Sequence, residues 1–207
     1  MLDRIVQAVE NCELDMIEKY VSDARREGKT AKEILNEGLV KGMDVVGKRF
    51  SDGELFVPEV LMAANTMQKG IDLIRDELAS SGGVQTKGKV VIGTVKGDLH
   101  DIGKKLVGMM FEGAGYQVVD LGVDVAAEAF VEKAREIDAD FVGMSAMLTT
   151  TMQEMKTVVR RLGEEELRAV PVAGGAPLTA EFAQSIGAHY SHDAASAVEL
   201  IKSLQQS

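Results

Sequence analysis

The chain has 207 residues, of which 45% are hydrophobic and 27% are charged, and its formal net charge is −10 at pH 7. This size and composition are ordinary for a globular protein and allow one large domain or two small ones. The acidic balance and the lack of a basic cluster argue against nucleic acid or a membrane surface as a partner. The single Cys12 excludes an internal disulfide framework and fits a reducing compartment.

The N-terminal segment is acidic and has no long apolar stretch, so we expect no signal peptide. No part of the sequence approaches the roughly 18 consecutive apolar residues that a membrane-spanning helix needs. We therefore expect a cytoplasmic protein that meets small molecules or other proteins.

The first part of the chain has the periodicity of helices. Apolar residues recur three or four positions apart in two stretches, at Leu35, Leu39, Met43, Val46 and Phe50 and at Val60, Leu61, Ala64, Met67, Ile71, Ile74 and Leu78. Thr30 with Glu33 predicts a capping box at the start of one helix, and Pro58 suits the first turn of the next. Two shorter helical segments precede Thr30, so we expect a four-helix bundle.

A run of small and polar residues, SSGGVQTKG at residues 80–88, separates this bundle from a different pattern. Short apolar runs then alternate with helical segments. The runs lie at residues 89–95, 116–121, 139–145, 169–174 and 188–190, and the helical segments lie near residues 103–112, 126–136, 152–162, 179–186 and 194–205. Five such units predict a parallel sheet with helices on both faces. We expect a helical bundle domain at residues 1–84 and an α/β domain at residues 85–207.

The α/β domain is predicted to hold a doubly wound, five-stranded parallel sheet of the Rossmann-like, flavodoxin-like kind. We assume the strand order 2-1-3-4-5, which is common for such sheets. Ligands then bind beyond the carboxyl ends of the strands, at the switch between strands one and three. The loops after strands one, three and four should share that cleft.

His100 and Asp98 stand out in the first of these loops, which reads KGDLHDIG. One imidazole nitrogen can bind a metal while the other donates a hydrogen bond to Asp98, which fixes the tautomer. In the alternative interpretation Asp98 caps the next helix and His100 is a solvated loop residue. Because one histidine cannot hold a bare zinc ion, a metal at His100 would arrive in a cofactor with its own macrocycle.

The other two loops contain hydroxyls and glycines. Ser145 and Thr149–Thr151 follow strand three, and some of these hydroxyls would serve as helix caps in the alternative interpretation. Gly174 and Gly175 end strand four, where they either make a turn or let a flat ligand lie against the backbone. The chain has no dinucleotide fingerprint, phosphate loop or nucleophile elbow, so nicotinamide, nucleotide and serine-hydrolase chemistry are not favoured.

Three motifs resemble the DxHxxG…SxL…GG signature of cobalamin-binding domains: Asp98-x-His100-x-x-Gly103, then Ser145 with Met147 and Leu148, then Gly174-Gly175. Met147 stands where that family has leucine, a volume-conserving change. Residues 47–67 look like the helical cap that precedes this domain in methionine synthase and in small corrinoid proteins of methyltransferase systems. The chain is similar to a stand-alone methyltransferase cognate corrinoid protein.

The resemblance implies that cobalamin binds with its own base displaced and its nucleotide tail beside the sheet. His100 would take the lower axial position on cobalt, supported by Asp98 and Ser145. The implied cofactor-binding residues are Asp98, His100, Asp101, Gly103, Ser145, Met147, Leu148, Thr149, Gly174, Gly175 and Tyr190, with His100 as the metal ligand. Phe50, Phe56, Leu61 and Met62 would face the upper side of the corrin, unless they are ordinary core residues.

The resemblance also implies a methyl carrier that has no turnover alone. Its partners would be a substrate:corrinoid methyltransferase, a second methyltransferase acting on tetrahydrofolate or a thiol such as coenzyme M, and a reductive activase. One alternative is the cobalamin-binding subunit of an adenosylcobalamin-dependent mutase. Another is a cobalamin sensor, although residues 1–30 are too short and acidic for its DNA-binding domain. The last alternative is a flavodoxin-like domain that binds no corrinoid.

Overall fold

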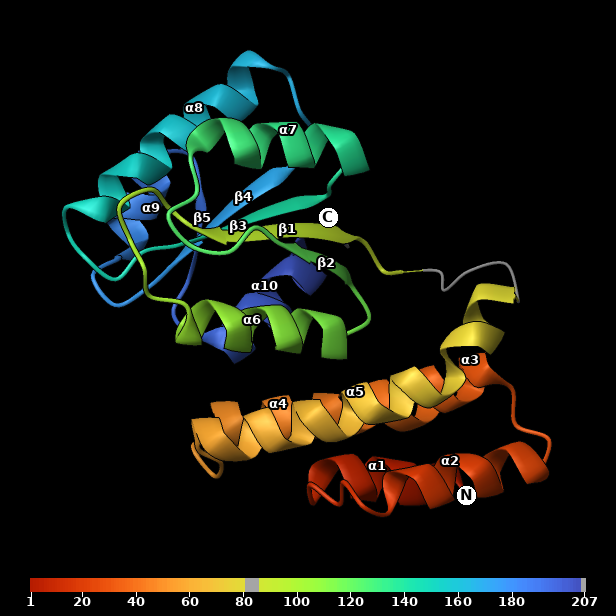
Figure 1. The fold of residues 1–207 in the computed structure, drawn as a ribbon. Coiled ribbons are helices and arrows are strands. Elements are labelled where there is room, and N and C mark those ends of the chain that lie inside the picture. The colour runs from red at the N-terminus through yellow and green to blue at the C-terminus, as the bar shows by residue number, and fades with distance from the viewer. Residues whose placement is uncertain (81–85, 206–207) are drawn as a thin grey trace. The chain divides into compact units, whose positions relative to one another are not determined.

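A computed structural model describes residues 1–80 and 86–205, so residues 81–85 of the expected linker lie outside the described part. The chain forms two compact units (Figure 1). One contains Met1–Thr86 with Gly113–Gly115, and the other contains Lys87–Glu112 with Tyr116–Ser207. None of the described helices combines the length and apolar character needed to cross a membrane.

The helical unit contains the four expected helices (Figure 1). Their bounds are α1 (Leu2–Glu10), α2 (Ile17–Arg26), a third helix made of α3 (Ala31–Glu33), η1 (Ile34–Val40) and α4 (Lys41–Ser51), and α5 (Val57–Ser80). The third helix differs from the expectation in one respect, because its η1 segment is π-helical. The predicted capping box is confirmed: the Glu33 N–H donates to the Thr30 hydroxyl, and the Thr30 N–H donates to the Glu33 carboxylate.

Part of the core of the helical unit comes from the predicted apolar stripes. The buried members are Leu35, Leu39, Met43 and Val46 from the third helix and Val60, Ala64, Met67, Ile74 and Leu78 from α5. Phe50 and Leu61 are half-buried. The core interpretation is wrong for Phe56 and Met62, since their side chains are 73% and 55% exposed. These two residues therefore form an apolar surface of this unit.

The α/β unit contains the predicted parallel sheet. Its strands are β1 (Lys89–Thr94), β2 (Gln117–Asp120), β3 (Phe141–Ser145), β4 (Val170–Gly174) and β5 (His189–Ser191). All pair in parallel in the order β2-β1-β3-β4-β5, so the assumed strand order is confirmed. The loops after β1, β3 and β4 consequently meet at one edge of the sheet.

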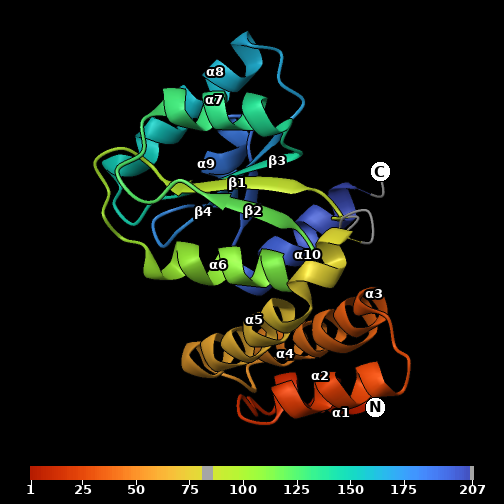
Figure 2. The same ribbon diagram turned by 45° about the vertical axis from the view of Figure 1, so that its right-hand side comes forward.

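Helices cover both faces of this sheet (Figures 1 and 2). On one face lie α7 (Ala127–Ile137), α8 (Glu154–Glu164) with the short η2 (Thr151–Gln153), and α9 (Ala180–Ser185); on the other lie α6 (Ile102–Gly113) and α10 (Ala194–Leu204). Because side chains alternate along a strand, Val142, Ala173 and Tyr190 pack in the core under α7 and α8. Val172 and Ser191, one position along from Ala173 and Tyr190, line a cavity on the α6 and α10 side.

Candidate functional site

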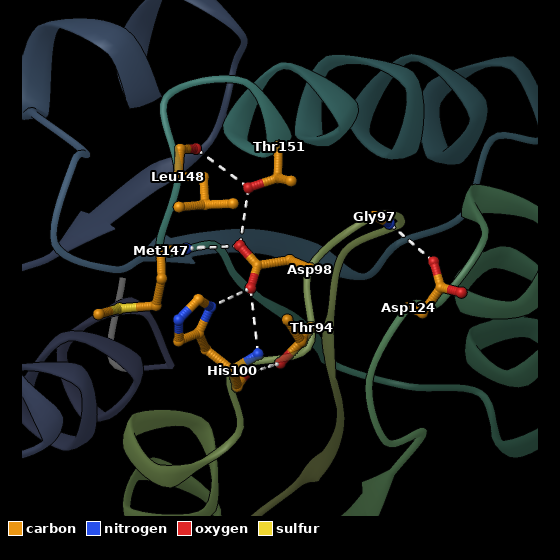
Figure 3. Close-up of polar contacts among 8 residues, drawn as sticks. All are labelled: Thr94, Gly97, Asp98, His100, Asp124, Met147, Leu148 and Thr151. Atoms are coloured by element: carbon orange, nitrogen blue, oxygen red, sulfur yellow. Dashed lines mark hydrogen bonds and ion pairs between the residues drawn. The ribbon is translucent and has the colours of Figure 1, made fainter.

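The Asp98 carboxylate is the centre of the loop that follows β1 (Figure 3). Its side chain is fully buried. One carboxylate oxygen accepts hydrogen bonds from the His100 ring Nδ1 at 2.7 Å and the His100 N–H at 3.1 Å. The other accepts from the Met147 N–H at 2.8 Å and the Thr151 hydroxyl at 2.7 Å. Burial alone raises the pKa of Asp98, but these hydrogen bonds outweigh it and hold the pKa well below its usual value.

The hydrogen bond between His100 Nδ1 and Asp98 determines which nitrogen of the imidazole ring is left for another partner. An ionised carboxylate only accepts hydrogen bonds, so Nδ1 donates to Asp98 and Nε2 is the ring nitrogen left for another partner. The His100 side chain is 56% exposed, in contrast to the buried carboxylate behind it. The arrangement fixes the ring and presents its Nε2 at the surface, which is the geometry that the sequence indicated for a metal ligand.

A second loop, between β2 and α7, holds the Asp98 loop from the other side (Figure 3). The Asp124 carboxylate accepts from the Gly97 N–H at 2.7 Å, and the Asp124 N–H donates to the Asp98 carbonyl at 2.9 Å. The Thr94 hydroxyl donates to the His100 carbonyl at 2.8 Å. Gly97 adopts φ +81°, a conformation that favours glycine. His100 is therefore positioned by contacts on both sides of its loop.

Large apolar side chains are exposed around His100. Leu99 and Ile102, one and two positions from His100 in the chain, are 73% and 72% exposed, and Met147 and Leu148 are 41% and 45% exposed. We call these four residues the apolar rim. Met147 and Leu148 were predicted site residues, but Leu99 and Ile102 were missed because motif spacing says nothing of the intervening positions. Exposed apolar groups around one polar group suit the face of a large flat ligand.

A cavity of about 310 Å³ lies between the sheet, α6 and α10. This volume is at the lower end for small-molecule sites. Five predicted site residues line it: Gly103, Ser145, Met147, Gly174 and Gly175. The remaining lining residues are Ile92, Lys104, Val107, Phe111, Gly143, Met144, Val172, Ala176, Ser191, His192, Asp193, Ala194 and Ala197. The cavity thus joins the three motifs to α10, which the motifs did not include.

The glycines at the cavity serve different purposes. Gly175 has φ +134°, and a Cβ atom there would lie 1.8 Å from the Ala146 carbonyl oxygen, so the backbone itself requires glycine. At Gly103, in contrast, an added Cβ would meet nothing within 4 Å. Glycine in a helix is less stable than alanine by roughly 0.5–1 kcal/mol. Since packing does not require Gly103, its missing side chain leaves space for a ligand.

Lys104 was not identified from the sequence. Its side chain is fully buried, it lines the cavity, and its ammonium pairs with Asp120, whose side chain is 38% exposed. The pair joins the first turn of α6 to the end of β2. Lysine seldom lies buried unless it is paired, but a helical lysine gives no signal in the sequence that it points inward.

Besides Asp98 and His100, four predicted site residues do not line the cavity. The Asp101 carboxylate pairs with Lys105, and the hydrogen bond from Lys105 lowers the pKa of Asp101. Leu148 and Thr149 are exposed on the loop after β3. Tyr190 lies on the opposite face of the sheet, packed against the core under α7 and α8, because β5 places Ser191 on the cavity side instead.

The supporting hydroxyl is also a different one from that expected. Thr151 contacts Asp98, whereas no hydrogen bond of the Ser145 hydroxyl is found among residues 1–80 and 86–205. Ser145 is the last residue of β3 and lines the cavity. Some of the hydroxyls after β3 were expected to cap the next helix. Thr150 is the residue before η2, but its side chain makes no capping hydrogen bond.

Two sequence families, both described as B12 binding domain, match residues 88–201 and residues 1–75. The chain is 42% identical over 205 residues to a corrinoid protein of Desulfitobacterium hafniense, covering 97% of this chain and 95% of that protein. It is 41% identical over 207 residues to the dimethylamine corrinoid protein of Methanosarcina barkeri, covering 99% and 97%.

A solved structure has the same fold. It is the methanol:cobalamin methyltransferase complex of Methanosarcina barkeri, with a TM-score of 0.90, 30% identity, and coverage of 98% of this chain and 78% of that chain. The two family matches fall in the helical and the α/β parts, and the relatives match along nearly the whole length. The chain therefore belongs to the B12-binding corrinoid proteins, and its cofactor is a corrinoid.

Proposed function

We propose that this chain is a methyl carrier that binds cobalamin with the cofactor's own base displaced and with His100 Nε2 as the lower axial ligand. It takes the methyl group from a substrate-specific methyltransferase and delivers it to a second methyltransferase, which acts on tetrahydrofolate or a thiol such as coenzyme M. The observation that carries this proposal is the buried Asp98 carboxylate, which holds the exposed His100 ring by its Nδ1 at 2.7 Å.

The residues present fit a corrinoid. The apolar rim is exposed on the segments that carry His100 and the partners of Asp98, which suits the flat apolar face of a macrocycle. The open space at Gly103 and the cavity beside it provide room for the nucleotide tail. When bound, the corrinoid supplies a cobalt ion on which a methyl group can be carried.

The chain's own residues would tune that ligand. Asp98 keeps the proton on Nδ1 and, as a negatively charged hydrogen-bond acceptor, raises the basicity of Nε2. The Met147 N–H and the Thr151 hydroxyl hold the carboxylate in place, so the ring cannot turn away without breaking this network. The Asp124 contacts restrict the backbone on the other side of the loop.

The names of the relatives support the choice of partners. The dimethylamine corrinoid protein and the methanol:cobalamin methyltransferase complex belong by name to methyl-group metabolism. We therefore propose a substrate:corrinoid methyltransferase as one partner, while an acceptor methyltransferase and a reductive activase stay predictions. Phe56 and Met62 are exposed on the helical unit, and their contact with the corrin stays a prediction.

The proposal is tested by reconstitution. Apo-protein is mixed with hydroxocobalamin, desalted and analysed for cobalt, with His100→Ala compared with His189→Ala, an exposed histidine outside the cavity lining. We expect wild type and His189→Ala to retain one corrinoid per chain with the same absorbance spectrum, and His100→Ala to differ in spectrum and affinity. A wild-type chain that retains no corrinoid, or a His100→Ala spectrum identical to wild type, contradicts the proposal.

The carrier role needs a separate assay. The chain is loaded with carbon-14-labelled methylcobalamin and incubated with coenzyme M or tetrahydrofolate and a corrinoid-dependent acceptor methyltransferase. We expect the label to move to one of the two acceptors. Tight binding of adenosylcobalamin with no methyl transfer to either acceptor would instead indicate a mutase subunit.

A further inference from the structure

The loop that carries His100 has almost no apolar packing of its own. Of residues 96–103, all of which the structure describes, Asp98 alone is buried, and Leu99 and Ile102 are 73% and 72% exposed. A loop with so little buried apolar surface gains little hydrophobic stabilisation, so hydrogen bonds must hold its backbone in place. The position of that backbone decides where the His100 ring lies.

The contacts from the loop after β3 fix the Asp98 carboxylate but leave its backbone less constrained. The Met147 N–H and the Thr151 hydroxyl donate to the carboxylate, which is joined to the main chain through rotatable bonds. The Asp98 N–H itself donates to the Val95 carbonyl at 3.2 Å, the long end of the normal range. The backbone at Asp98 therefore needs a second constraint.

Asp124, in the loop between β2 and α7, supplies this constraint at two points. Its carboxylate accepts from the Gly97 N–H at 2.7 Å (Figure 3). Its own N–H donates to the Asp98 carbonyl at 2.9 Å. The first of these hydrogen bonds is charge-assisted, and such bonds are stronger than those between neutral groups. Because the two contacts are made by consecutive residues, together they fix the backbone just before His100.

The segment that carries Asp124 is itself fastened to the end of β1. The Gly122 carbonyl accepts from the Thr94 N–H at 3.0 Å, and the Val125 N–H donates to the Thr94 carbonyl at 3.0 Å. Val95 and Val125, both buried, pair as an isolated parallel bridge. Between these anchors Asp124 adopts φ +54°, a left-handed conformation that is uncommon outside glycine and that aspartate and asparagine tolerate best. Residues held in such conformations cluster at functional sites.

We propose that Asp124 is a positioning residue for the cobalt ligand, which keeps His100 Nε2 in place by fixing the backbone of Gly97 and Asp98. The inference rests on the proposed axial role of His100. It adds a residue that lies outside the three sequence motifs and outside the cavity lining. Asp124 is exposed, so removal of its carboxylate leaves the core intact and should displace the ligand without unfolding the chain.

Three substitutions separate the role of the carboxylate from that of the backbone conformation. Asp124→Asn keeps an oxygen that accepts from the Gly97 N–H, and asparagine tolerates the left-handed conformation. Asp124→Gly removes the acceptor without straining the backbone, whereas Asp124→Ala removes the acceptor and adds strain. The matched control is Asp138→Ala, which adds the same kind of strain at φ +52°, at the C-terminal end of α7.

The first measurement is amide hydrogen exchange of the full apo-chain, which needs no cofactor. We expect the Gly97 N–H to exchange at least tenfold faster in Asp124→Ala and Asp124→Gly than in wild type. Its rate should stay within threefold of wild type in Asp124→Asn and Asp138→Ala. The amides of β1 and β3 should keep their rates in all four variants, which shows that the variants are folded. An unchanged Gly97 rate in Asp124→Gly overturns the inference.

The second measurement is electron paramagnetic resonance of the cobalt(II) state, with the chain labelled with nitrogen-15 and the cobalamin unlabelled. A nitrogen from the chain on cobalt then splits each line into two. We expect the ratio of this doublet signal to the remaining cobalt signal to fall at least tenfold in Asp124→Ala and Asp124→Gly, and to stay at the wild-type value in Asp124→Asn and Asp138→Ala. A wild-type ratio in Asp124→Gly, or an equal loss in Asp124→Asn and Asp124→Gly, overturns the positioning role.

Failure of the inference and failure of the proposed function are distinguishable. If the wild-type chain binds cobalamin without doublets, the proposed axial role of His100 is wrong and the inference falls with it. If wild type and Asp124→Gly show equal doublets, His100 is still the ligand, and only the positioning role of Asp124 is wrong.

Discussion

Thr151→Val tests whether the Asp98 network stabilises the loop that carries His100. The Thr151 hydroxyl lies 2.7 Å from an Asp98 carboxylate oxygen, and Thr151 and Asp98 are 7% and 0% exposed. Hydrogen bonds to charged groups contribute about 1.5–3 kcal/mol. Valine has nearly the shape of threonine, so little packing is lost. We therefore expect the free energy of unfolding of the α/β unit to fall by about 1.5–3 kcal/mol.

The assay is urea unfolding of the full apo-chain, followed by circular dichroism. Thr149→Val is the control, because it makes the same substitution two residues away at an exposed position outside the Asp98 network. We expect this control to lie within about 0.5 kcal/mol of wild type. If Thr151→Val and Thr149→Val unfold at the same urea concentration, the hydroxyl does not stabilise the Asp98 carboxylate and the reasoning is refuted.

Three further predictions follow from the structure. Gly103→Ala should raise the thermal midpoint of the apo-chain by calorimetry, because the added Cβ meets nothing, yet weaken cobalamin binding in dialysis; unchanged binding would refute a ligand at Gly103. Asp120→Ala leaves the buried Lys104 ammonium unpaired and should lower the free energy of unfolding by up to about 3–5 kcal/mol. Lys104→Met should lower it less, and equal urea midpoints for the two variants would contradict this. The Thr30 N–H lowers the folded-state pKa of Glu33 from 4.5 to about 2. Glu33→Gln should therefore lower the thermal midpoint at pH 7, and the difference between its midpoint and that of wild type should vanish as the pH falls from 4.5 to 2.

Much of the fold follows from local pattern. The alternation of short apolar runs with helices predicted the five strands, and the common doubly wound order predicted their neighbours correctly. The π-helical turn at Ile34–Val40 was not foreseen, since hydrophobic spacing does not distinguish it from an α-helix. Phe56 and Met62 lie outside the predicted apolar stripes, which therefore did not assign them to the core or to the surface, and both are exposed.

The site was predictable where chemistry depends on short spacing. An aspartate two residues from a histidine can reach its ring within one loop, and the two are hydrogen-bonded. The choice of Thr151 over Ser145 depends on how the loop after β3 turns into η2, which sequence does not specify. Tyr190 was misplaced relative to the cavity because a three-residue strand gives too little alternation to assign its faces.

The central claim is that His100 replaces the cofactor's own base on cobalt. Its most direct test is electron paramagnetic resonance of the reduced cobalt(II) state, with the chain labelled with nitrogen-15 and the cobalamin unlabelled. A nitrogen-14 ligand splits each cobalt line into three, and a nitrogen-15 ligand splits it into two. We predict doublets in the labelled wild type, triplets in the unlabelled chain, and loss of this splitting in His100→Ala but not in His189→Ala, a histidine outside the cavity lining. Triplets that survive labelling of the chain would show that cobalamin keeps its own base, and the His100 assignment would be wrong.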